Sequence, residues 1–119
     1  MRKFAVCWLL LFIFPISVFA QQYHPVASFG TPTVGTCGTS PSIVAGSTDG
    51  AGSINIGTGV VTSCAVNFST TLQATPTCVV TTNSTTTVPA ITTLTTSVLT
   101  VGLSVSLPSG KISWICFLK

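Results

Sequence analysis

After residue 20, this chain has very few side chains that can carry a charge or exchange a proton. Its one carboxylate side chain is Asp49, its one imidazole is His24, and its two cations are Lys111 and Lys119. Acid–base catalysis, metal binding and phosphate binding each need several such groups close together. We therefore expect a protein that is not an enzyme, with no catalytic residue, no metal site and no cofactor.

Each of the isolated polar motifs favours a structural interpretation. Asp49 lies in the glycine-rich segment 46–52, where an aspartate usually closes a turn through its own backbone; the alternative is that it accepts hydrogen bonds from a ligand. His24 is predicted to be a solvated residue without an acid partner. The segment Gly57-Thr58-Gly59 lacks the lysine of a phosphate-binding loop.

Trp114 and two asparagines are the remaining candidates for contact with a ligand or a sugar. Trp114 is in phase with Ile112 and Cys116, so we predict a place in the core or between protomers rather than a stacking platform for a sugar. Asn67-Phe68-Ser69 and Asn83-Ser84-Thr85 match the acceptor pattern for N-linked glycans. A glycan at either asparagine requires a host that has the attachment machinery.

Residues 1–20 have the pattern of a secretory signal peptide. Arg2 and Lys3 precede an apolar run over 4–14, and small or modest residues stand before a cleavage site after Ala20. The alternative is a retained membrane anchor, for which the run is short. We expect a secreted or periplasmic protein with no membrane segment after cleavage.

Four cysteines follow the predicted cleavage site, and an even number in an exported chain indicates two disulfides. We predict that Cys78 pairs with Cys116, if their strands are antiparallel neighbours, and that Cys37 then pairs with Cys64. The other two pairings stay open because the strand order cannot be read from the sequence. A zinc site is the alternative, but the chain has no Cys-x-x-Cys pair.

The predicted mature chain carries a net charge of about +1, from two lysines against one aspartate. Binding to nucleic acid or to anionic lipid needs clusters of lysine and arginine, so neither is expected as a partner. So little charge also leaves little repulsion between copies, which favours self-association.

Strand-forming residues dominate the rest of the sequence. Residues 21–36 are predicted to be an extended arm or linker, with a tail of no function as the alternative. Residues 37–119 are predicted to form one domain, because short runs of alternating polar and apolar residues are separated by turn residues. The expected strands are 42–44, 53–56, 60–68, 78–82, 88–92, 97–107 and 111–118, with a loop over 69–76.

These strands indicate an all-β fold, a small antiparallel β-sandwich or a jelly-roll-like domain. The clearest buried face is the alternating set Leu99, Val101, Leu103, Val105 and Leu107. Val66 and Phe68, which share a face with Cys64, are also predicted to lie in the core. The threonine run at 85–87 would also fit a mucin-like stalk, but aliphatic residues interrupt such runs regularly.

Several segments in order resemble a small terminal domain of phage tail and fibre proteins and of related exported proteins. They are residues 37–43, 46–54, 62–68, 76–81 and 112–116. The spacing of Phe68, Pro76, Val79 and Trp114-Ile115 is also similar to that of H-type lectins. The resemblance implies a compact β-sandwich, often a homotrimer, used for attachment or as a structural cap.

We therefore expect an exported, non-enzymatic β-sandwich module for attachment or for surface or virion structure. The alternative is a trimeric lectin-like protein that binds carbohydrate. A homotrimer and a cell-surface or glycan receptor are the expected partners, and the residues that would bind the receptor are not identified by any motif.

Overall fold

The computed structural model describes residues 24–25 and 30–118. The predicted signal peptide at 1–20, most of 21–29 and Lys119 lie outside them. In the described part, the chain forms nine strands and no helix. The strands are β1 (His24–Pro25), β2 (Thr33–Val34), β3 (Ser42–Ile43), β4 (Ala51–Asn55), β5 (Ser63–Asn67), β6 (Thr77–Thr82), β7 (Pro89–Leu94), β8 (Val98–Leu103) and β9 (Lys111–Leu118).

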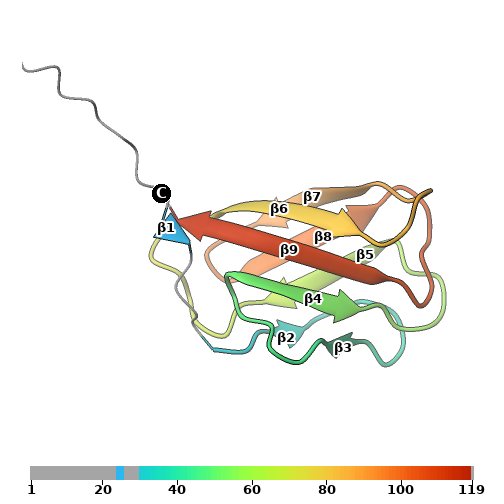
Figure 1. Ribbon diagram of the computed structural model, residues 1–119, viewed down its shortest axis with the longest axis horizontal. Helices are drawn as coiled ribbons and strands as arrows, with labels where there is room; N and C mark the ends of the chain where they lie inside the picture. The colour runs from blue at the N-terminus through green and yellow to red at the C-terminus, as the bar shows by residue number, and fades with distance from the viewer. Residues whose placement is uncertain (1–23, 26–29, 119) are drawn as a thin grey trace, which may run out of the picture.

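The strands form two antiparallel sheets that pack face to face, as Figure 1 shows. In the first sheet, β9 lies in the middle, with β6 along one side and β4 followed by β3 along the other. The short strand β1 pairs with the last residues of β9, beyond the end of β4. The second sheet has the order β2-β5-β8-β7. The predicted antiparallel β-sandwich is therefore confirmed.

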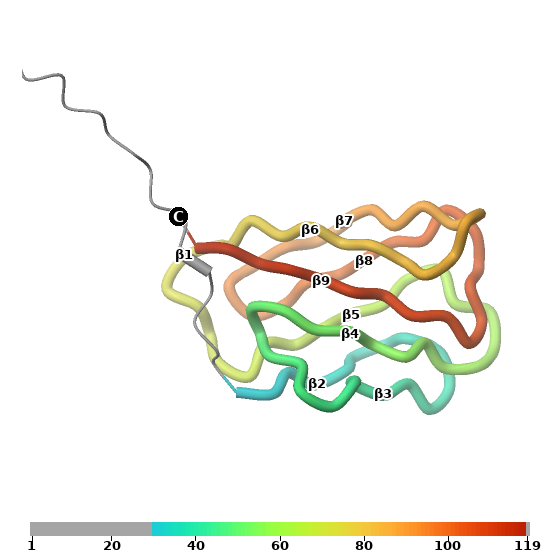
Figure 2. The backbone as a smooth tube through the Cα atoms, viewed as in Figure 1, coloured from blue at the N-terminus to red at the C-terminus, as the bar shows by residue number. Residues whose placement is uncertain are grey.

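The connections between strands gather at two ends of the sandwich, which can be followed in Figure 2. The β4–β5, β6–β7 and β8–β9 connections lie at one end. The β5–β6 and β7–β8 connections lie at the other, near the end of β9. This arrangement puts loops that are far apart in the sequence beside one another.

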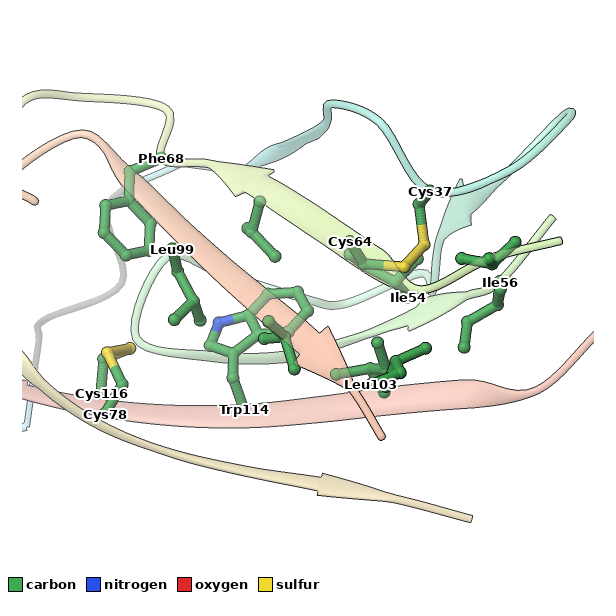
Figure 3. Packing of buried hydrophobic residues seen from close by; sticks show 14 of the residues in the cluster. Cys37, Ile54, Ile56, Cys64, Phe68, Cys78, Leu99, Leu103, Trp114 and Cys116 are labelled. Carbon is green, nitrogen blue, oxygen red and sulfur yellow. A yellow bond between two sulfur atoms is a disulfide. The ribbon is translucent and has the colours of Figure 1, made fainter. Parts of the chain in front are cut away.

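Alternating residues bury one face of each long strand, because successive side chains in a strand point to opposite sides. Cys64, Val66 and Phe68 point into the core as the sequence predicts, and so do the alternate residues of β9, Ile112, Trp114 and Cys116. Figure 3 shows how side chains from both sheets meet between the layers.

The buried face predicted for residues 97–107 ends earlier than expected. Leu99, Val101 and Leu103 are buried, but Val105 is 56% exposed. The reason is that β8 ends at Leu103 and the chain then turns away, with the Ser104 amide donating to the Val88 carbonyl at 3.1 Å. The prediction that Val105 is buried is therefore wrong.

Part of the predicted arm at 21–36 belongs to the second sheet. Thr33 and Val34 form β2 and pair with Asn67 and Val66 of β5. The amide of Gly35 continues this pairing with a 2.8 Å hydrogen bond to the carbonyl of Ala65. The sandwich therefore begins before residue 37.

Both predicted disulfides are present. Cys37, in the β2–β3 connection, bonds to Cys64 of β5, and Cys78 of β6 bonds to Cys116 of β9. Cys78 and Cys116 are directly opposite, with their Cα atoms 4.1 Å apart. The predicted neighbour relation between these two strands is confirmed. A hairpin around the loop at 69–76 does not form, because β5 and β6 belong to different sheets.

We predict that replacing both cysteines of either pair by alanine lowers the free energy of unfolding by about 2–4 kcal/mol. The bonded residues are 27 and 38 positions apart. Because loop-closure entropy grows only with the logarithm of loop length, the two losses should differ by only about 0.3 kcal/mol. Urea unfolding of the two double variants beside the native chain measures both values. An unchanged midpoint in either variant would contradict the prediction.

Candidate functional site

Asp49, the one carboxylate side chain of the sequence, is completely buried. One carboxylate oxygen accepts a hydrogen bond from the Ser69 amide at 2.8 Å, and the other accepts one from the Ser69 hydroxyl at 2.6 Å. The interpretation of Asp49 as a turn cap is wrong. The turn is closed instead by Thr48, whose amide donates to the Ala51 carbonyl at 2.8 Å. Asp49 is thus free to reach a loop 20 residues further along the chain.

The main chain of Asp49 holds the largest side chain of the core. Its carbonyl oxygen accepts a hydrogen bond from the indole Nε1 of Trp114 at 3.3 Å. Gly52 lies opposite Trp114 in the ladder, and a Cβ there would be 2.5 Å from the indole. The glycine therefore leaves the space that the ring fills. Trp114 is a core residue, as predicted, and is not exposed for stacking on a sugar.

The other chemically interesting residues do not gather into one site. The four cysteines form two disulfides, one between the β2–β3 connection and β5 and the other between β6 and β9. His24 lies in β1 and pairs with Leu118. Within residues 24–25 and 30–118, no three His, Cys, Asp or Glu side chains come together in a way that could hold a metal ion.

The two asparagines of the glycan acceptor pattern lie in different surroundings. Asn83 is exposed after β6, and its Oδ1 accepts a hydrogen bond from the Lys111 amide at 2.7 Å. Asn67 is half-buried at the end of β5, and the hydroxyl of Ser69 in its motif is held by Asp49. In the folded chain, the motif at Asn83 is thus the more open of the two.

Exposed valines lie in the β4–β5, β6–β7 and β8–β9 connections, which share one end of the sandwich. We call this surface the valine end; it consists of Val60, Val88 and Val105, with exposed fractions of 87%, 67% and 56%. Hydrogen bonds next to each valine hold the three loops together. The Val88 amide donates to the Ser104 hydroxyl at 2.9 Å, and the Val61 amide donates to the Ser106 hydroxyl at 2.9 Å.

A shallow hollow of about 350 Å³ adjoins the valine end on the outer face of the second sheet. It exists because Gly102 has no side chain, and a Cβ there would lie 2.7 Å from the methyl group of Thr92. Its wall is almost entirely apolar, although three of the residues that form it carry hydroxyls; it is contributed by Thr62, Val88, Ala90, Thr92, Leu103 and Ser104.

The valine end can bind by apolar contact and by hydrogen bonds from hydroxyls. Among the described residues, no carboxylate or imidazole lies in it or in the hollow, and the exposed Lys111 begins β9 at the same end, so the surface suits a partner that carries no positive charge. Sequence reasoning missed this site because it placed Val60 and Val105 in strands. The neighbouring residues do indicate loops at both positions, since Gly59 precedes Val60 and serines flank Val105.

The chain has no match among known protein families, curated proteins or solved structures. The resemblance to phage tail and fibre domains and to H-type lectins stays a prediction. In the part of the chain that the structure describes, no helix is long and apolar enough to cross a membrane.

We predict that Asp49→Ala lowers the free energy of unfolding by about 1–3 kcal/mol, because the two part-buried hydrogen bonds from Ser69 to the buried carboxylate are lost. Asp49→Asn should cost less, since an amide oxygen still accepts from the Ser69 amide. Chemical unfolding of both variants measures the effect, with the exposed Asn55→Ala as the control. Equal stability of Asp49→Ala and the native chain would contradict the structural role of this carboxylate.

Proposed function

We propose that this protein is an exported, non-enzymatic β-sandwich module for attachment or for surface or virion structure, and that the valine end contacts its partner. One contrast supports the proposal. The one carboxylate side chain is buried and hydrogen-bonded inside the fold, whereas three valines are exposed in connections that share one end. Exposed apolar groups rimmed by polar residues are typical of interaction surfaces.

The disulfides support export. Two disulfides in so small a domain are compatible with an extracellular or periplasmic protein, because thiols stay reduced in most cytosols. The predicted signal peptide agrees with this location. Disulfides also suit a domain of this size, because its small core alone gives limited stability.

A lectin-like protein that binds carbohydrate is the second candidate. The hydroxyl of Thr62 beside the hollow can exchange hydrogen bonds with a sugar, but the wall is almost entirely apolar, and the hydroxyls of Thr92 and Ser104 already bond to the main chain. Sugar-binding sites commonly offer an exposed aromatic ring, and both Trp114 and Phe68 are buried here. We therefore rank carbohydrate binding second. The homotrimer implied by the resemblance stays a prediction.

Binding of the labelled, disulfide-bonded protein to intact cells or virions from its own source tests the proposal. We predict that Val60→Lys with Val105→Lys reduces binding at least tenfold, because the new ammonium groups must stay hydrated. Ala74→Lys, which adds one charge on an exposed residue of the β5–β6 connection, is the control and should bind normally. Binding that is unchanged by the two valine substitutions would contradict the proposal.

A glycan array separates the two candidates. An attachment module that recognises an uncharged protein surface gives no specific sugar signal. A specific signal that is lost when Gly102→Val fills the hollow would instead support the lectin-like function.

A further inference from the structure

One edge of the sandwich lacks the features that protect sheet edges from pairing with other chains. The edge strands are β3 and β6 in the first sheet and β2 and β7 in the second. Strands β2 and β3 have two residues each, and β7 begins with Pro89 and is irregular between Ile91 and Thr93. Short length, proline and bulges all discourage edge pairing. Strand β6 has six residues in regular pairing, without proline, glycine or charge.

The free side of β6 presents backbone groups that have no partner in the described residues. The Cys116 amide donates to the Gly50 carbonyl at 2.7 Å, on the side of β9 away from β6. Cys78, directly opposite Cys116, therefore forms no backbone hydrogen bond with it, and its own N–H and C=O point away from β9. The N–H and C=O groups of Val80, two residues further along β6, also point away from β9. Figure 1 shows β6 at the margin of its sheet.

We propose that β6 pairs antiparallel with β6 of a second copy, across a two-fold axis at Val79. In this register, Cys78 of each copy faces Val80 of the other, and each facing pair exchanges two N–H···O bonds. Val79 faces Val79 of the partner copy in the position where side chains approach most closely. Every unpaired group of Cys78 and Val80 is thereby satisfied by an identical strand.

The side chains favour this register. Val79 is 59% exposed on the outer face and lies beside Ile115, which is 52% exposed and pairs in turn with Ala51. Joining two copies at Val79 continues this apolar row across both sheets, and such cross-strand pairs stabilise a sheet. Among the described residues, no charged side chain lies on β6. Lys111 lies beyond the Thr82 end of β6. The two-fold axis at Val79 therefore places the Lys111 side chains of the two copies at opposite ends of the β6–β6 contact.

The contact predicts a dimer. A two-fold contact uses the same strand on both copies, so it joins them in pairs, whereas the resemblance implies a trimer. One strand edge buries less surface than the roughly 1,200–2,000 Å² of a stable interface, so the dimer should dissociate on dilution. The inference depends on the fold and not on the proposed function.

Sedimentation equilibrium of the disulfide-bonded chain over a wide concentration range tests the proposal. We expect a monomer–dimer equilibrium that Val79→Lys weakens at least tenfold, because two like charges then face each other. Ala45→Lys is the control, because Ala45 is exposed in the β3–β4 connection, on the far side of the first sheet from β6 and outside the valine end. Unfolding midpoints verify that both variants fold. A mass that stays monomeric at high concentration, a trimer, or equal weakening by both variants would overturn the proposal.

Cross-linking tests the register separately. Val79→Cys should form a disulfide between copies under mild oxidation, because facing residues at such a position have Cα atoms about 4.5 Å apart. Thr81→Cys should not, since Thr81 would face Thr77 of the partner copy. Peptide mapping verifies that the two native disulfides are intact. No link from Val79→Cys, or equal links from both variants, would overturn the register.

Discussion

The sandwich depends on one buried polar connection, in which Asp49 joins Trp114 of β9 to Ser69 of the β5–β6 connection. The Asp49 carbonyl accepts from the indole, and its carboxylate accepts twice from Ser69. A buried carboxylate is costly unless its oxygens are hydrogen-bonded, and both are. The link thereby fixes the loop that carries the chain from the second sheet, at β5, to the first, at β6.

Because Asp49 is the one carboxylate side chain of the sequence and is buried, the surface has no carboxylate side chain. The surface is solvated mainly by threonine and serine hydroxyls, with the cation Lys111 exposed among the described residues. Such a surface neither attracts nor repels partners over long distances, so association depends on short-range apolar contact and hydrogen bonding. The valine end and the free edge of β6 are the two places where the fold offers these interactions. They lie on different parts of the molecule, so self-association and attachment can be tested independently.

Local patterns predicted the fold well, and long-range contacts account for what they missed. The alternation in β5 and β9 identified Val66 and Trp114 as core residues because strand periodicity is local. The partner of Asp49 could not be predicted, since Ser69 lies 20 residues away in another loop. The valine end was missed for a related reason. Val105 continues the period of β8 in the sequence, but hydrogen bonding between two loops turns the chain away from the sheet.

A double-mutant cycle between Asp49 and Ser69 tests this account most directly. The free energies of unfolding are measured for the native chain, Asp49→Ala, Ser69→Ala and the double variant. If the two side chains stabilise the fold through each other, the double variant loses less stability than the sum of the single losses, with a coupling of about 1–3 kcal/mol. Losses that add within about 0.3–0.5 kcal/mol would contradict the account, because they would show that Asp49 and Ser69 act independently.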